Sequence, residues 1–167
     1  MPRPRTYRTE GVVLKSMPMG EAGLVVTIYS MNDGKVRAVG RGVRKPSSKM
    51  VGSLEPFNRV TVAVTSAKSA SIDTISQAHV LESFAQLRSN LDALAKGIYI
   101  LELVDKFGTE GGANPGLYGL LIDLLRLLDK DPDQGVALRY FELRVLNYSG
   151  FMPELYRCVE CRVELLP

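Results

Sequence analysis

The spacing of the apolar residues changes once along this chain, close to His79. Before that point, short runs rich in β-branched residues are separated by Gly, Pro or Asn-Asp-Gly, which is typical of strands joined by tight turns. After it, apolar residues recur at intervals of three and four, the spacing of amphipathic helices. We therefore expect an α+β protein with a β unit over residues 1–78 and a helical unit over residues 79–157.

Five runs in the first part predict strands, at residues 11–17, 24–31, 35–41, 59–66 and 71–78. Apolar residues alternate within them, so that Val60, Val62 and Val64 share one face. A tight turn with Gly34 at positive φ is expected before the third run. Five short strands in about 70 residues fit a small closed barrel, and the OB-fold is the leading candidate. Barrels of that fold bind single-stranded nucleic acid, although this is an analogy from fold and not from a site.

Three amphipathic helices are predicted in the second part. Their apolar stripes are expected, in chain order, at Leu91, Leu94, Ile98, Leu101 and Val104; at Leu117, Leu120, Leu121, Leu124 and Leu128; and at Leu138, Phe141, Val145 and Tyr148. The expected start signals are Ser89 with Asp92, Asn114-Pro115 and Asp131-Pro132, and the expected stops are Gly108 and Gly150. The run 117–128 is apolar enough either to be buried on several sides or to line a groove for a partner segment.

The two parts also differ in charge. Residues 1–78 contain 12 Lys and Arg against 5 Asp and Glu, a net of +7, whereas residues 79–167 contain 9 against 13, a net of −4. A basic unit joined to an acidic one indicates a polyanionic partner for the first, because each cation placed on a phosphate releases condensed counterions. The alternative is a solvated surface with uneven charge.

The basic charge is concentrated between residues 35 and 49, a segment without a single acidic residue. Its Arg forks and Lys ammonium groups suit phosphate contacts, which position a nucleic-acid backbone without reading its sequence. The candidate DNA-binding residues are Lys35, Arg37, Arg41, Arg44, Lys45 and Lys49. The alternative is a charged loop that only aids solubility. Tyr29 and Phe57 could stack on bases, but an aromatic residue in this context belongs more often to the core.

Cys158 and Cys161 form one Cys-x-x-Cys pair, which is half of a tetrahedral zinc site. No second pair follows within the chain, so residues 158–167 read as the remnant of a zinc-knuckle module. Zinc would need a second pair of ligands from elsewhere, and no cofactor is otherwise indicated.

Other function classes find little support. The chain has one histidine and lacks the G-x-S-x-G, H-E-x-x-H and P-loop patterns, so we expect a binding protein and not an enzyme. No stretch reaches the roughly 18 apolar residues of a membrane span. The first residues lack the apolar core of a secretory signal, and we expect a cytoplasmic protein.

Several segments, in order along the chain, resemble one known family. They are residues 9–15, 20–22, 34–36, 40–46 and 54–57 in the first part, and residues 141–144, 150–151 and 153–155 with the Cys158 and Cys161 pair near the end. Together they are similar to the bacterial recombination mediator RecO. The resemblance implies an N-terminal OB-fold, a helical domain and a role in recombinational DNA repair.

RecO proteins bind single- and double-stranded DNA, anneal complementary strands and act with RecR and sometimes RecF. They also engage single-strand-binding protein and help to load the recombinase RecA. Members with two Cys-x-x-Cys pairs hold zinc, whereas this chain has the first pair only and carries Arg162 where they often have Gly. We therefore expect the chain to be short at its C-terminal end relative to the family. The alternative function is a protein–protein adaptor whose helical domain docks a partner peptide.

Overall fold

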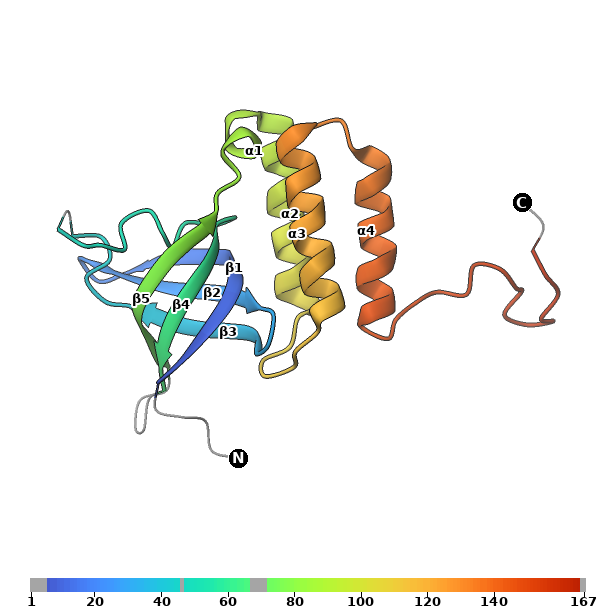
Figure 1. Cartoon of the computed structure of the whole chain (residues 1–167). Coiled ribbons are helices and arrows are strands. Elements are labelled where there is room, and N and C mark those ends of the chain that lie inside the picture. The colour runs from blue at the N-terminus through green and yellow to red at the C-terminus, as the bar shows by residue number, and fades with distance from the viewer. Residues whose placement is uncertain (1–5, 46, 67–71, 166–167) are drawn as a thin grey trace.

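A computed structural model describes residues 6–45, 47–66 and 72–165 of the chain. Pro46 and Ser71, which belong to segments discussed above, lie outside these residues. A β-barrel stands on one side, four helices pack beside it, and the segment after the last helix leads away from both (Figure 1). None of the described helices has the length and apolar content that crossing a membrane requires.

Five strands close the barrel in the order β1-β2-β3-β5-β4, with every pair antiparallel except β3 and β5. Val60, Val62 and Val64 all lie in its buried interior, as their alternation predicted. Gly34 has φ of 66° at the turn before β3. The expected α+β class and OB-fold barrel are confirmed. The strands are β1 (Thr6–Met19), β2 (Gly23–Ser30), β3 (Gly34–Gly40), β4 (Arg59–Thr65) and β5 (Asp73–Glu82).

Strand β5 continues four residues beyond the predicted end at Ala78. Its apolar alternation is lost there, since Val80 and Leu81 are exposed. The pairing of β5 with β4 nevertheless continues to Arg59 and Glu82, with two irregularities in register along the way. An ion pair between the side chains of these two residues closes the ladder.

The helices are α1 (Ala85–Ser89), α2 (Leu91–Phe107), α3 (Pro115–Lys130) and α4 (Gly135–Tyr148). The predicted start of α3 is confirmed, because the Asn114 side chain accepts a hydrogen bond from the Leu117 N–H. The start of α2 was wrong: Ser89 ends the short helix α1, and Asn90 caps α2. The start at Asp131 was also wrong, because its carboxylate accepts from the Asp133 N–H in a turn and α4 begins only at Gly135.

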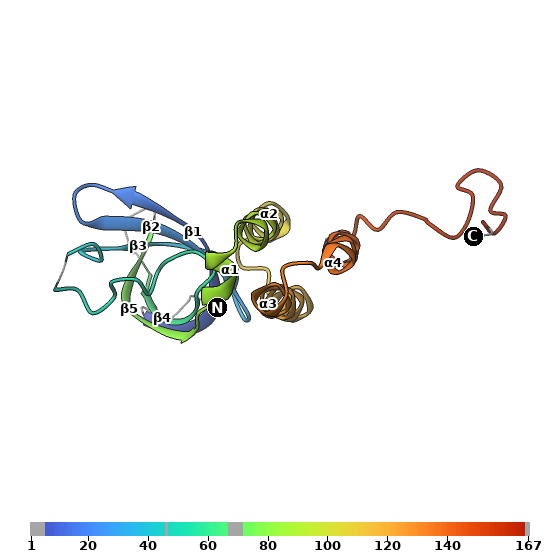
Figure 2. The ribbon, with the colours of Figure 1, turned by 90° about the horizontal axis from the view of Figure 1, so that it is seen from above.

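The predicted apolar stripe of α2 is confirmed for Leu94, Leu101 and Val104, which belong to or pack against the core, but not for its other two residues. Leu91 and Ile98 are 81% and 53% exposed, and Ala93, Gly97 and Ile100 face the core instead. The stripes of α3 and α4 hold, and α3 packs against α1, α2 and α4 (Figures 1 and 2). Its central position explains why the apolar run 117–128 is buried on several sides, as core.

The same apolar cluster joins the helices to the barrel. Val12, Leu14, Tyr29 and Phe57 belong to it together with side chains of α2, α3 and α4. Tyr29 and Phe57 are 1% and 4% exposed, which confirms that they are core residues. The barrel and the helices therefore share one core.

A polar network crosses the same junction. Tyr118 of α3 donates a hydrogen bond to Glu10 of β1 at 2.7 Å, and Arg59 of β4 donates to the same carboxylate at 2.7 Å. Arg59 also pairs with Glu82 of β5, which in turn accepts from Arg126 of α3 at 2.8 Å. Three strands and one helix are thereby held in a defined arrangement.

Candidate nucleic-acid interface

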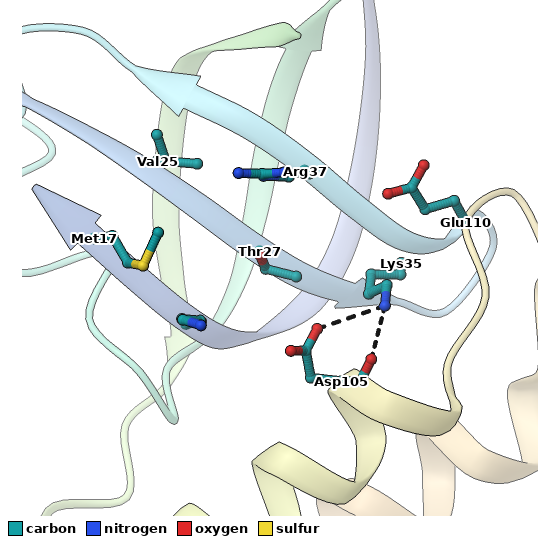
Figure 3. A pocket seen from close by; sticks show the side chains of 8 residues that line it. Met17, Val25, Thr27, Lys35, Arg37, Asp105 and Glu110 are labelled. Atoms are coloured by element: carbon teal, nitrogen blue, oxygen red, sulfur yellow. Dashed lines mark hydrogen bonds and ion pairs between the residues drawn. The ribbon is translucent and has the colours of Figure 1, made fainter. Parts of the chain in front are cut away.

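A groove runs over the outer face of β1, β2 and β3 beside the helices. Lys15 pairs with Thr27, and Thr27 pairs with Arg37, so these three side chains form a row across the three strands. The row lines a cavity of about 250 Å³ together with Met17 and Val25. Figure 3 shows Arg37, Thr27, Val25 and Met17 on the strands, with Lys35 and Asp105 at the end nearest α2. The groove therefore combines cations with apolar side chains, and the carboxylates of Asp105 and Glu110 lie at its end beside Lys35.

The sequence reasoning did not single out Lys15. Strict alternation after Leu14, which packs against the helices, would turn Lys15 to the opposite face. The strand has a register shift between Val13 and Lys15, and such a bulge lets two successive residues face the same way. No signal in the sequence marks this bulge, because it is visible only in the pairing of β1 with β2.

Lys35 differs from the other candidate cations. Its ammonium donates to the backbone carbonyl of Asp105 at 2.7 Å and lies 3.5 Å from the Asp105 carboxylate (Figure 3). The two side chains are only 21% and 29% exposed. The Lys35 ammonium therefore joins β3 to α2, and because it is already paired with Asp105 it is expected to bind an external phosphate more weakly than an unpaired cation would.

The other five candidates have exposed side chains. Within residues 6–45, 47–66 and 72–165, none of them takes part in an ion pair. Arg37 projects from β3, and the rest follow in the loop after it: Arg41, Arg44, Lys45 and Lys49.

This basic loop is anchored to the barrel and not detached from it. Val43 is buried in the barrel interior, and the Arg44 N–H donates to the Ala22 carbonyl beside the turn between β1 and β2. The loop thus lies at the end of the barrel remote from the helices (Figure 1). Arg37 lies on β3, and Arg41 follows directly after the end of this strand, so the loop cations follow the groove residue Arg37 along the chain.

Cys158 and Cys161 are both free and lie in a turn of the C-terminal segment. The Arg162 N–H donates to the Cys158 carbonyl, and Arg162 has φ of 62°, the left-handed region that favours the glycine of the related motif. Hydrogen bonds from the Cys161 and Glu160 N–H groups lower the pKa of the Cys158 thiol. Among the described residues no group of three or more His, Cys, Asp or Glu side chains comes together. The two thiols are thus half of a ligand set, and these residues do not fit a complete zinc site.

Comparison with known proteins agrees with this architecture. The model of the recombination protein O N-terminal domain matches residues 3–84, and that of its C-terminal domain matches residues 88–167. The chain belongs to the RecO family. The first RecO match covers the barrel, and the second covers α2, α3, α4 and the cysteine pair.

Curated relatives named DNA repair protein RecO are similar over most of the chain. The protein of Desulforudis audaxviator is 38% identical over 94% of this chain and 62% of its own length. That of Desulforamulus reducens is 38% identical over 96% and 62%, and that of Dehalococcoides mccartyi (strain 195) is 32% identical over 99% and 65%. The chain thus spans somewhat less than two thirds of these RecO proteins.

Proposed function

We propose that this chain is the DNA-binding part of a non-catalytic protein of recombinational repair, which holds and anneals single-stranded DNA in the cytoplasm. The observation that carries the proposal is the set of exposed cations on Arg37 and in the loop that follows β3, none of which forms an ion pair within the described residues, together with the Lys15–Arg37 row across the strands. Both belong to the OB-fold barrel and the loop that follows its third strand. The RecO relatives, named as DNA repair proteins, support the same role.

The chemistry of these residues suits annealing. Arginine and lysine grip phosphates and release counterions without reading the bases. A strand held mainly through its backbone keeps most Watson–Crick edges free, and a complementary strand can then pair with them. A double-stranded segment presents the same phosphates, so the surface is expected to retain the annealed product as well.

We assign protein partners to the side opposite the barrel. Val136 and Tyr140 on α4 are 87% and 56% exposed, and Leu143 is 37% exposed. Such apolar side chains on a helix favour contact with another protein. RecR, RecF and single-strand-binding protein are the proposed partners, and loading of recombinase is the proposed result.

The test replaces Arg41, Arg44 and Lys45 together by alanine and measures binding of a fluorescent single strand. We expect a loss of about tenfold or more at moderate salt, because three phosphate contacts disappear. Lys35→Met is the matched control, since it removes one cation that is already paired with Asp105. It should bind within about twofold of the original chain.

Strand annealing with and without single-strand-binding protein then separates a mediator from a simple binder. The triple variant should lose annealing in both conditions. If the unaltered chain leaves oligonucleotides unshifted, the adaptor alternative takes the place of this proposal. If the triple variant binds like the unaltered chain, the basic loop is not the contact surface.

A further inference from the structure

A second cavity, of about 320 Å³, opens between the barrel and α2 on the other side of Lys15. Leu14, Phe57 and Leu101 give it an apolar floor, and each of them is at most 6% exposed. Ile98, which the apolar spacing had placed in the core, stands half exposed at its edge. The volume and the apolar lining are in the range of small-molecule binding sites.

The floor of this cavity is preformed, and the backbone of Phe57 within it is strained. Phe57 has φ of 74°, an unfavourable conformation for a bulky residue, and its N–H donates to the Val13 carbonyl at 2.9 Å. Arg88 fixes the residues on either side by donating to the Pro56 carbonyl and to Asn58 Oδ1, both at 2.7 Å. Strain of this kind persists where the surroundings hold it, and it is frequent at binding sites.

The cavity adjoins the nucleic-acid groove, because Lys15 and Asp105 line both. A strand whose phosphates contact Arg37 and Lys15 would therefore pass its mouth. We propose that the cavity receives one unstacked nucleobase of the bound strand, an inference that rests on the proposed function. Lys106, which also lines the cavity and is exposed, is placed to hold a neighbouring phosphate.

The carboxylate of Glu102 at the rim would orient the bound base by accepting a hydrogen bond from it. The apolar floor takes one face of the base, as aromatic and aliphatic platforms do in proteins that bind single strands. Glu102 lines the same cavity and carries a carboxylate, which can only accept hydrogen bonds. A base with an exocyclic amino group can donate to it, as cytosine N4 does to acidic side chains, whereas thymine offers no amino group. The site should thus favour cytosine over thymine.

The test fills the cavity with Ile98→Trp and uses Leu91→Trp as its control. Both positions are exposed and apolar on α2, but only Ile98 borders the cavity. Binding is measured to an oligomer of about 15 deoxycytidines and to a base-free oligomer with the same number of phosphates. We expect Ile98→Trp to weaken the first about fivefold or more, without changing the second or the melting temperature. Leu91→Trp should change neither.

A second variant, Glu102→Gln, tests the orientation. The original chain should bind deoxycytidine oligomers several-fold more tightly than thymidine oligomers, and the variant should reduce that ratio. An unchanged affinity of Ile98→Trp, or an equal loss on the base-free oligomer, overturns the base site while leaving the DNA-binding proposal intact. If the original chain binds neither oligomer, the proposed function itself fails.

Discussion

The junction between barrel and helices predicts a measurable effect for Tyr118→Phe. The Tyr118 side chain is buried, at 4% exposure, and its hydroxyl donates to Glu10 Oε1 at 2.7 Å. A hydrogen bond to a charged group contributes about 1.5–3 kcal/mol. Arg59 continues to donate to the same oxygen, so the lower part of this range applies. We expect a loss of about 1.5–2 kcal/mol in the free energy of unfolding, or about 3–8 °C in Tm for a chain of this size.

The effect should depend on pH in a defined direction. Burial raises the pKa of Glu10, but the hydrogen bonds from Tyr118 and Arg59 outweigh it, and the pKa lies below its ordinary value of 4.5. A carboxyl group with a lowered folded-state pKa contributes stability above its unfolded pKa and loses it as the pH falls through the folded value. Removing the Tyr118 hydroxyl raises the pKa of Glu10 again. The stability difference between the two proteins should therefore be largest near neutral pH and shrink in acid.

Urea unfolding at neutral and acidic pH measures both quantities. Tyr99→Phe is the matched control, because Tyr99 also donates to a carboxylate, Glu142, at 2.9 Å but is 41% exposed. Its loss should stay below about 0.5 kcal/mol. Equal losses for the two variants, or a Tyr118→Phe effect that does not change with pH, would refute the reasoning.

Five further substitutions test the packing and the cap of α3. Gly97→Ala should lower the free energy of unfolding by about 1–3 kcal/mol, because the added methyl would lie 2.8 Å from the Phe57 ring. Gly119→Ala should raise it by up to about 1 kcal/mol, because the space around Gly119 is open. Thermal melts compare the two variants directly. Asn114→Ala removes the cap of α3 and should lower the free energy of unfolding, measured in urea, by about 1 kcal/mol. Asn114→Asp should retain most of the stability that the cap provides, because aspartate also caps helices. Phe141→Ala empties a fully buried site in the helical core, and a loss outside about 3–5 kcal/mol would show that the core there is not packed as described.

The barrel was predictable because its strands obey local rules. Val60, Val62 and Val64 alternate with residues of the opposite face, of which Thr61 and Thr65 are partly exposed, and the alternation alone assigns their faces. The start of α3 was equally local, since Asn114 and Pro115 are a capping pair in any context. Helix α1 was missed because five residues are too few to show a period, and it displaced the cap of α2 by one residue.

The charged site was predictable only in part, because its residues depend on distant partners. The acid-free segment identified Arg37 and the loop cations, whose exposure needs no tertiary contact. Lys35 belongs to the same segment, but its partner Asp105 lies 70 residues further along the chain. Lys15 reaches the groove through a bulge that the sequence does not mark. Local patterns therefore locate a basic surface but do not decide which of its charges are free.

The central claim is that the loop cations meet a nucleic-acid backbone, and the salt dependence of single-strand binding tests it most directly. Each neutralised phosphate contributes about −0.7 to the slope of log affinity against log salt. Replacing Arg41, Arg44 and Lys45 by alanine should make that slope less steep by about 2, while Lys35→Met should leave it nearly unchanged. A slope near zero for the original chain, or the same slope in the triple variant, would contradict the account.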